Sequence, residues 1–583
     1  MGSLLNHVNI AFGEAAESIG LSAEYGRAIR AVRPELGDFQ CSGILGAARK
    51  LNRSAEEMAD EMALFLRLKC GNLFENVTVV APGYINVRVA RTTLARFVAE
   101  TVADPRLGIG VVPRAKFFFI DYGGPNVAKA LHVGHLRSAV IGESLRRILG
   151  FAGHRVMTDI HVGDWGTPMG MLIDQIRLDF PNWRDLAKSD ADCSAHGLTF
   201  EVLQRLYPVA SAACKIDPTR AESARLTTAA LQAGNEDYQI LWRRMVSLSL
   251  SSALSEFSRL GAHFDLLLGE SDSAGEIPDM LSDLVARNIA HYDERALVIP
   301  LQSKSDRSKL PPMIVEKADG AALYATTDLA TILTRVRDFK PDAILYVVDQ
   351  RQSLHFRQLF RAAEIAGYVE KTQLLHVAFG TVNGPDNKPF KTRDGSVMRL
   401  RDLLDLTEAA ALKRLESSGH EEGSRENLEA IAKQVSVAAL KFADLSSDRI
   451  SGYVFDAEQM TSFEGKTGPY IQYAAVRSAS VISKVQQNSA QDIIVETPEE
   501  RSLILACLAF PEALSDATVH FSPDRIASSA FEIAQAFNRF YAACSIRSAP
   551  EKIRDSRIVL TTLASKVLCL ALWLLGIETP EAM

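Results

Sequence analysis

The sequence predicts a multidomain protein with α/β and all-α parts, built around a Rossmann-like nucleotide-binding domain. Three observations support this prediction. A buried strand, a glycine-containing turn and a long amphipathic helix follow one another over residues 116–151. Further strand-like runs return only after a helix-rich segment, which indicates an insertion. From about Asp402 the pattern is almost entirely helical. The length of 583 residues allows about three to five units of ordinary size.

Residues 1–110 are expected to form a compact N-terminal α/β module. In SAEEMADEMALFLRL, which runs from Ser54 to Leu68, apolar residues recur at helical spacing. The following run, VTVVAPGYINVRV, alternates and is interrupted at Pro82-Gly83, as expected for a β-hairpin.

Residues 111–400 are expected to form the nucleotide-binding domain, with an insertion at about 180–310. The segment KFFFIDY, Lys116–Tyr122, is short, apolar and aromatic, as a buried strand is. After the turn GGPN, residues His132–Phe151 predict one long amphipathic helix. Strand-like stretches resume at LVIPL, MIVEK, ILYVVD and LLHVAFG, where we expect the parallel sheet to be completed.

Residues 401–583 are expected to form a helical bundle, with blocks such as LEAIAKQVSVAALKFADL and RIVLTTLASKVLCLALWLLGI. The longest apolar run there, Val567–Ile577, is shorter than the ~20 residues that cross a bilayer. The first twenty residues lack the basic stretch and hydrophobic block of a secretory signal. We therefore predict a cytoplasmic protein without a membrane segment.

The composition excludes several classes of protein. A chain with 47% hydrophobic and 23% charged residues is neither collagen-like, coiled-coil nor disordered. None of its seven cysteines falls at C-x-x-C spacing, which argues against structural zinc and against a disulfide framework. The net charge of −7 gives no general attraction for nucleic acid. Composition alone therefore points away from an RNA-binding protein.

The motif His132-Val133-Gly134-His135 stands where the long helix begins. A helix N-terminus presents unpaired N–H groups and a partial positive charge, both of which favour phosphate. Gly134 leaves room for a base and ribose near the backbone. The two imidazoles can donate hydrogen bonds to a phosphate in a transition state. Capping or partly buried histidines, or a metal pair, are the alternatives, whereas a dehydrogenase is disfavoured because this turn lacks G-x-G-x-x-G.

A second cluster, KPFKTRDG at 388–395, holds three cations within six residues after the strand-like LLHVAFG. A mobile cationic loop can close over a triphosphate and neutralise departing pyrophosphate. By itself such a segment is more often a solvated basic turn. Together with H-x-G-H in one large chain it is a more specific sign of nucleotide chemistry.

A third group offers carboxylates and hydrogen-bonding side chains. Asp121 and Gln352 should emerge at the carboxyl ends of strands, where open α/β sheets bind ligands. Tyr324 and Asp328 share a face if YATTD is helical. Two acidic groups beside a phosphate-binding helix suggest a cationic substrate, and a guanidinium fits best because its planar fork pairs with a carboxylate. Taken singly, each of these residues is more often structural.

At this point the chain resembles class I aminoacyl-tRNA synthetases, and within them arginyl-tRNA synthetases, over essentially its whole length. Seven blocks follow the family's order. They are DYGGPNVAKALHVGHLRSAVIGESL, HVGDWGTPMGMLI, ADGAALYATTDLA, YVVDQRQSLHF, KPFKTRDG, FEGKTGPYIQYAAVR and LLGIETPEAM. The resemblance implies ligation of L-arginine to tRNA(Arg), with ATP and Mg²⁺, by a monomer. It also implies that tRNA is needed for the first step.

The resemblance also implies roles for individual residues. His132, Gly134, His135 and Lys391 would bind ATP, and the histidines and Lys391 would act in catalysis. The loop reads F-K-T-R where most class I enzymes have K-M-S-K-S, so Arg393 is the nearest later cation and Lys129 would compensate. Arginine would be held by Asp121, Asn126, Tyr324, Asp328 and Gln352. Asp121 suits either the α-amino group or the guanidinium, and Asp328 is the stronger choice for the guanidinium.

For tRNA, the resemblance implies an elbow-binding N-terminal module and an anticodon-binding C-terminal bundle. Tyr84 and Asn86 match a base-recognition pair that stacks on and hydrogen-bonds a splayed base. Tyr470, Gln472, Tyr473 and Arg477 are expected to contact RNA in the bundle. Residues 441–583 hold 13 Lys and Arg against 17 Asp and Glu, so any RNA-binding face must be local.

Three departures from the family pattern are visible: GGPN before the histidines, Pro168-Met169 in the second block, and Ala582 before the last residue. The departures in the turn and the loop are the only support for a divergent paralogue that binds RNA without catalysis. A resistance or accessory arginyl-transfer enzyme is a further alternative. A small nucleotidyltransferase with H-x-G-H would not need the long helical region.

Overall fold

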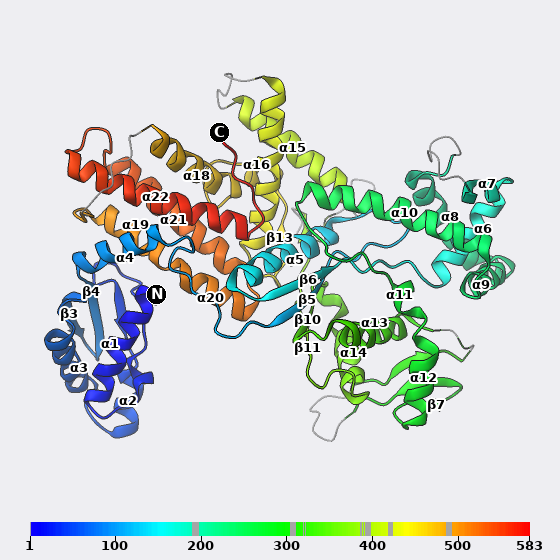
Figure 1. Ribbon diagram of the computed structural model, residues 1–583, viewed down its shortest axis with the longest axis horizontal. Helices are drawn as coiled ribbons and strands as arrows, with labels where there is room; N and C mark the ends of the chain where they lie inside the picture. Colours follow the sequence, from blue (N-terminus) through cyan, green and yellow to red (C-terminus); the bar gives the residue numbers. More distant parts are fainter. Residues whose placement is uncertain are drawn as a thin grey trace. The chain divides into compact units, whose positions relative to one another are not determined.

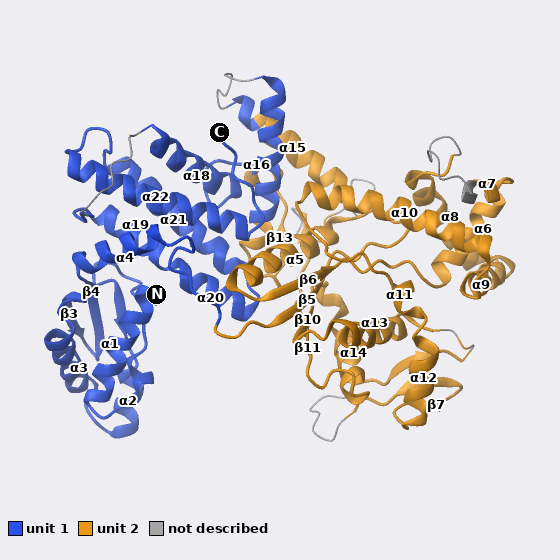
Figure 2. Ribbon diagram, in the orientation of Figure 1, with its two compact units in different colours: residues 1–112, 414–442, 461–583 blue, residues 113–413, 443–460 orange. Residues whose placement is uncertain are grey.

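The structure is a computed structural model of the chain, and its description covers residues 2–188, 197–302, 310–318, 320, 322–384, 388, 390, 398–417, 424–484 and 493–583. The chain divides into two compact units, which Figure 2 colours separately. Unit 1 contains residues 1–112, 414–442 and 461–583, and unit 2 contains residues 113–413 and 443–460. The two ends of the chain therefore share one unit.

Unit 2 is built on a parallel four-stranded sheet in the order β11-β10-β5-β6 (Figure 1). Its strands are β5 (Phe117–Asp121), β6 (Arg155–Asp159), β10 (Ala343–Tyr346) and β11 (Gln373–His376). Every residue of β5 is buried, as the run of aromatic and apolar side chains predicts. The register aligns Asp121 with Asp159 and with Tyr346, so the carboxyl ends of three strands meet at one edge.

The helix α5 (Val133–Ala152) confirms the predicted helix after the GGPN turn. It packs closely on the end of β5 because Gly142 has no side chain: a Cβ there would lie 2.3 Å from Cγ of Tyr122. The helix ends at Gly153, whose φ of 100° is readily adopted only by glycine. The strand β5 and the helix α5 are thus fixed against each other.

A helix-rich segment separates β6 from β10, as predicted. Its helices are α6 (Thr167–Asp179), α7 (Trp183–Lys188), α8 (Phe200–Ile216), α9 (Pro218–Gln232), α10 (Glu236–Arg259), α11 (Glu270–Ala274) and α12 (Ile277–Ala286). Unit 2 also contains α13 (Tyr324–Phe339), η3 (Gln350–Gln352), α14 (Ser353–Ile365), β12 (Val382–Asn383), β13 (Tyr453–Val454) and α17 (Ala457–Met460). The core of this unit includes Phe119 and Ile344 from the sheet, Leu329 from α13 and Leu359 from α14.

The expectation that all four later strand-like runs join the parallel sheet is wrong for two of them. LVIPL and MIVEK form β8 (Ala296–Ile299) and β9 (Met313–Glu316), which pair with β7 (His291–Asp293) in a separate antiparallel sheet. Glu294 and Arg295 connect β7 to β8 with φ of 48° and 74°. A two-residue turn of this kind joins antiparallel strands, whereas a parallel pair needs a long crossover.

The N-terminal part of unit 1 is an α/β module with an antiparallel sheet in the order β1-β2-β4-β3. Its elements are α1 (Leu4–Ser18), η1 (Ala23–Gly26), β1 (Ala28–Arg30), β2 (Phe39–Cys41), α2 (Ile44–Leu51), α3 (Ala55–Lys69), β3 (Phe74–Val80), β4 (Tyr84–Val89) and α4 (Arg91–Ala103). The predicted helix after Ser54 and the hairpin at Pro82-Gly83 are confirmed as α3 and β3–β4.

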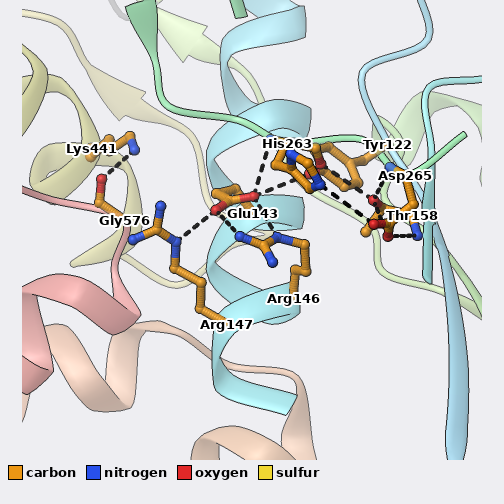
Figure 3. A network of polar contacts seen from close by, with 9 residues as sticks. All are labelled: Tyr122, Glu143, Arg146, Arg147, Thr158, His263, Asp265, Lys441 and Gly576. Atoms are coloured by element: carbon orange, nitrogen blue, oxygen red, sulfur yellow. Dashed lines mark hydrogen bonds and ion pairs between the residues drawn. The ribbon is translucent and has the colours of Figure 1, made fainter. Parts of the chain in front are cut away.

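The rest of unit 1 is helical, as predicted, with α18 (Gly468–Ser483), α19 (Pro498–Leu508), α20 (Phe510–His520), α21 (Asp524–Ala543) and α22 (Glu551–Leu574). Two further helices, α15 (Leu400–Ser417) and α16 (Arg425–Leu445), have residues in both units. Buried polar contacts tie unit 1 together. Lys441 donates to the carbonyl of Gly576 (Figure 3), and Arg501 Nε donates to Asp38 at 3.0 Å.

Two stretches, Pro498–His520 and Glu551–Leu574, are long and apolar enough to cross a membrane by composition alone. The second stretch includes most of Val567–Ile577, the apolar run that by itself is too short to cross a bilayer. The first is two helices, α19 and α20, and α22 packs against α18 and α21. Leu560, Leu568 and Leu572 of α22 are fully buried. The apolar side chains of α22 are therefore those of a core helix in a bundle.

Candidate active site

A cavity of about 300 Å³ lies at the carboxyl edge of the parallel sheet. Its walls come from the loops after β5, β6 and β10, the first turn of α5, and α11 and α13. Eight of the predicted site residues line it together: Asp121, Asn126, His132, Gly134, His135, Tyr324, Asp328 and Gln352. The H-x-G-H residues and the acidic residues thus share one cavity.

The two histidines lie at the start of α5, with ring centroids 4.1 Å apart. His132 is the N-cap residue, and its Nδ1 accepts a hydrogen bond from the Gly134 N–H at 3.0 Å. The Nδ1 of His135 accepts from the His132 N–H at 3.0 Å. In each neutral ring the proton is therefore on Nε2. The capping role and the cavity position occur together in these residues.

Desolvation is the main cause that lowers the pKa of both imidazoles, although His132 as a residue reaches the surface. This desolvation lowers the pKa of His132, with help from the charge of Arg351, and it lowers the pKa of His135 to about 3, with help from His132. At neutral pH the rings are hydrogen-bond donors without a full positive charge. Positive charge for a triphosphate must come from other residues.

Lys129, Lys391 and Arg393 are the cations predicted for that purpose. Lys129 is exposed, and its Nζ lies 5.0 Å from the ring centroid of Tyr207. It is not among the cavity-lining residues, yet its charge lowers the pKa values of His132 and His135. Lys391 and Arg393 lie outside the described residues.

Asp121 is already paired within the protein. Arg335 donates to Asp121 Oδ2 at 2.7 Å and to Asp159 Oδ2 at 2.6 Å, and the arginine is fully buried. These two carboxylates therefore hold an internal guanidinium at the base of the cavity. The Oδ2 of Asp121 is therefore already engaged within the protein.

Asp328 and Tyr324 share one face of α13, as predicted from their spacing. Asp328 Oδ2 lies 2.7 Å from Nε2 of His355, and its side chain is 12% exposed. The negative charge of Asp328, followed by burial, raises the pKa of the Tyr324 hydroxyl. The phenol therefore remains protonated at neutral pH and can act as a hydrogen-bond donor.

Glu270, the first residue of α11, also lines the cavity and was missed by the sequence analysis. Burial, Asp328 and Asp164 together raise the pKa of its carboxyl group to about 8. Two acidic side chains that repel each other in a partly dry cavity form a site that a cation would stabilise. The only sequence signal was the apolar run Leu266–Leu268, followed by glycine and a carboxylate.

Other lining residues missed by the sequence analysis include Ser138, His161, Arg335, Tyr346, Asp349 and Arg351. The guanidinium of Arg351 donates to both carboxylate oxygens of Asp349, at 2.9 and 2.7 Å. Its side chain is 71% exposed, so this cation stands at the solvent side of the cavity. Among the described residues, Arg351 supplies a positive charge that acts on His132.

A polar network anchors the segment that leads to Glu270 (Figure 3). Glu143 of α5 accepts from the His263 N–H at 3.2 Å and from Arg146 and Arg147. The Tyr122 hydroxyl donates to the His263 carbonyl. Asp265 accepts from the N–H and the hydroxyl of Thr158 in β6, at 2.8 and 2.9 Å. The segment after α10 is thus fixed both to α5 and to the parallel sheet.

The tRNA-contact predictions fall in unit 1. Tyr84 and Asn86 lie on one face of β4, two residues apart. Asn86 is 1% exposed, and its Oδ1 accepts from Gln40 at 2.8 Å. Its amide Nδ2 has no hydrogen-bond partner among the described residues. Tyr84 is half-buried, so the pair offers more surface at the tyrosine than at the asparagine.

In the bundle, Tyr473 and Arg477 lie one turn apart on α18. The guanidinium of Arg477 stands 4.3 Å from the ring centroid of Tyr473 and 5.3 Å from that of Tyr541. Tyr470 packs against Phe531, with centroids 5.8 Å apart. These residues form a group of aromatic rings with one cation.

Gln472 corrects the prediction made for it. It is fully buried, and its amide donates to the carbonyl of Glu578 at 2.7 Å. Through this hydrogen bond, Gln472 of α18 contacts the C-terminal segment. It therefore has no surface to offer to a nucleotide.

Three family models match the chain in succession. Residues 6–89 match the arginyl tRNA synthetase N-terminal domain, residues 102–457 the catalytic domain of class I (R) tRNA synthetases, and residues 471–583 the DALR anticodon-binding domain. The chain is 42% identical to an arginine–tRNA ligase of Maricaulis maris and 40% identical to one of Alkaliphilus oremlandii. Each match covers 100% of both chains.

Solved structures share the fold. An arginyl-tRNA synthetase of Plasmodium falciparum superimposes with a TM-score of 0.82 at 22% identity, over 100% of both chains. The Thermus thermophilus arginyl-tRNA synthetase gives 0.79 at 23% identity, over 99% of this chain and 100% of the other. Together with the full-length relatives and the matched catalytic model, these findings place the chain in the arginyl-tRNA synthetase family of class I aminoacyl-tRNA synthetases.

Proposed function

We propose that this protein is an arginine–tRNA ligase, which activates L-arginine with ATP and transfers it to the 3′ end of tRNA(Arg). One observation carries the proposal. The H-x-G-H residues and the acidic pair Asp328 and Glu270 line the same cavity. Such a site can hold a triphosphate and a guanidinium next to each other, as the joining of ATP to arginine requires.

In the first step, a carboxylate oxygen of arginine attacks the α-phosphorus of ATP, which enters as its Mg²⁺ complex. The bond between the α-phosphorus and the oxygen that bridges it to the β-phosphorus breaks. Arginyl-adenylate forms, and pyrophosphate leaves with that oxygen. The Nε2–H groups of His132 and His135 are suited to donate to phosphate oxygens as charge develops. Lys129, Lys391 and Arg393 would supply the positive charge that neutral imidazoles lack. Gly134 would leave room for the nucleoside.

The guanidinium of arginine would pair with Asp328 and Glu270, with Tyr324 as a further polar contact. The proton that Glu270 holds near neutral pH would leave when the cation arrives. Asn126 and Gln352 would orient the other polar groups of the amino acid. Lysine lacks the planar fork and would leave part of this acidic wall unpaired, which is a costly mismatch in a buried site.

In the second step, the terminal ribose hydroxyl of tRNA attacks the adenylate carbonyl, loses its proton and displaces AMP. Tyr84 is proposed to recognise a tRNA loop base, and Tyr470, Tyr473 and Arg477 are proposed to contact the anticodon region. Asn86 is as buried as Gln472 and is not proposed as a base contact. Rings beside a guanidinium suit stacking of unpaired bases. We also infer a monomer that acts in the cytoplasm, which sedimentation and fractionation would test.

The decisive assay is arginine-dependent exchange between labelled pyrophosphate and ATP, with and without tRNA, followed by charging of labelled tRNA. We expect exchange with arginine, none with lysine, and formation of arginyl-tRNA. A protein that binds tRNA but exchanges with no amino acid would refute the proposal.

A further inference from the structure

We propose that Asp164 is a positioning residue that fixes Glu270 in the arginine-binding wall, through the first turn of α11. The inference rests on the proposed function and extends it to a residue that touches neither arginine nor ATP. Asp164 follows β6 and is 4% exposed. It is remote in sequence from α11 yet in direct contact with it.

The carboxylate of Asp164 binds α11 at the residue next to Glu270. Its Oδ1 accepts from the Ser271 N–H at 3.0 Å, and its Oδ2 accepts from the Ser271 hydroxyl at 2.7 Å. The backbone of the same segment bonds the loop after β6, because the Glu270 N–H donates to the Val162 carbonyl at 3.0 Å. Glu270 is thus held on both sides, with its side chain left to face the cavity.

Gly269 makes this arrangement possible. A Cβ at that position would lie 2.6 Å from Oδ1 of Asp164, too close for any side chain. The φ of Gly269 is −129°, which every residue adopts, so the glycine is needed for space and not for backbone conformation. The loop carrying Asp164 is itself held, because Trp242 Nε1 donates to the Asp164 carbonyl at 2.7 Å.

Asp164 acts on Glu270 by charge as well as by contact. The charged and titratable groups that face Glu270 are Asp328 and Tyr324 of α13, Asp164, and Lys129 before α5. Asp328 and Asp164 raise the pKa of Glu270, and Lys129 lowers it. Burial raises the pKa of Asp164 itself, and the Ser271 hydrogen bonds and His161 oppose that rise only in part. Removing the charge of Asp164 should therefore lower the pKa of Glu270, whereas shifting α11 alone should leave that charge effect in place.

The test uses two variants that separate contact from charge. Asp164→Asn removes the charge and one of the two acceptor oxygens that bind Ser271. Gly269→Ala pushes α11 away from Asp164 and keeps every charge. The matched control is Asp174→Asn, because Asp174 is also buried, accepts from the Ser223 hydroxyl at 2.7 Å and does not line the cavity.

The measurement is the arginine KM in full-length protein by pyrophosphate exchange, at about pH 8.5 where Glu270 is mostly ionised in every variant. We expect roughly a tenfold rise for both Asp164→Asn and Gly269→Ala, as for loss of a charged hydrogen bond, with the ATP KM unchanged. The midpoint of the pH profile should fall only in Asp164→Asn. The control should keep the wild-type arginine KM.

An arginine KM within twofold of wild type in both variants, or an equal rise in Asp174→Asn, would overturn the role of Asp164. Melting temperatures show whether a variant folds, and if Asp164→Asn does not, Gly269→Ala decides by itself. If the wild-type protein shows no arginine-dependent exchange at all, the proposed function fails instead. The two failures are therefore distinguishable.

Discussion

At the scale of single residues, the protonation state of Glu270 has the clearest measurable consequence, which is a pH dependence of arginine binding. Its raised pKa of about 8 means that the folded protein holds a proton there at neutral pH. A guanidinium favours the ionised form, so arginine binding releases that proton. We expect arginine affinity to rise with pH, by up to roughly tenfold per unit below pH 8, and to level off above it.

Calorimetric titration with arginine between about pH 6 and 8.5 measures this dependence. The variant Glu270→Gln carries no titratable group at this position and should give a flatter profile with weaker binding. An equally steep profile in Glu270→Gln would assign the titration to another group, such as Asp164.

Asp328 should contribute to arginine binding and not to ATP binding. It lines the cavity beside Glu270 and contacts His355 rather than any residue of the H-x-G-H motif. Asp328→Ala should raise the arginine KM on the order of 10- to 100-fold, because a charged hydrogen bond is lost in a partly buried site. Asp338→Ala, an exposed carboxylate on the same helix, is the control. Equal arginine KM values in the two variants would exclude Asp328 from recognition.

Residue-level prediction from the sequence worked where the signal was local. The spacing in HVGH and YATTD correctly placed His132 and His135 at the start of α5, and Tyr324 and Asp328 on one face of α13. Glu270 was missed because a five-residue helix has no periodicity, and its place depends on contacts with residues about a hundred positions away. Asp121 was found, but no local pattern reveals that Arg335 is its partner.

At the scale of elements, the packing of α5 against the end of β5 should limit what Gly142 can become. Alanine is the better helix former, yet its Cβ would collide with the Tyr122 ring at 2.3 Å. We expect Gly142→Ala to destabilise the protein by about 1–3 kcal/mol, the usual cost of overpacking. Thermal denaturation measures the effect.

Gly150→Ala is the matched control on the same helix. Gly150 is exposed, and a Cβ there would meet no atom within 4 Å. This variant should be as stable as wild type or more stable, by up to about 1 kcal/mol. If both alanine variants gained stability, α5 would not be in close contact with Tyr122.

Elements were predictable from the sequence when burial or periodicity was strong, as in β5, α3 and the β3–β4 hairpin. The separate sheet of β7, β8 and β9 was not predictable, because short apolar runs show a strand without showing its partner. Gln472 shows a related limit. A match to a family motif cannot tell an exposed side chain from one that is buried beneath its neighbours.

At the scale of the whole molecule, the overall charge of −7 requires tRNA contacts to be local. Among the described residues of the bundle, Tyr473 is the ring best suited to stacking on a base. Arg477 lies beside it and also beside Tyr541. Tyr473→Ala should weaken tRNA binding by roughly 5- to 100-fold, the range for loss of one base stack. Fluorescence anisotropy with labelled tRNA measures this affinity, and Tyr292→Ala, an exposed tyrosine in unit 2, is the control.

The central claim is that one bound molecule reaches both the acidic wall and the helix N-terminus. A crystal structure with a non-hydrolysable arginyl-adenylate analogue tests it most directly. We expect the guanidinium between Asp328 and Glu270, with the phosphate mimic next to His132 and His135 in the same cavity. An analogue whose guanidinium contacts neither carboxylate while its adenosine occupies the H-x-G-H turn would contradict the account.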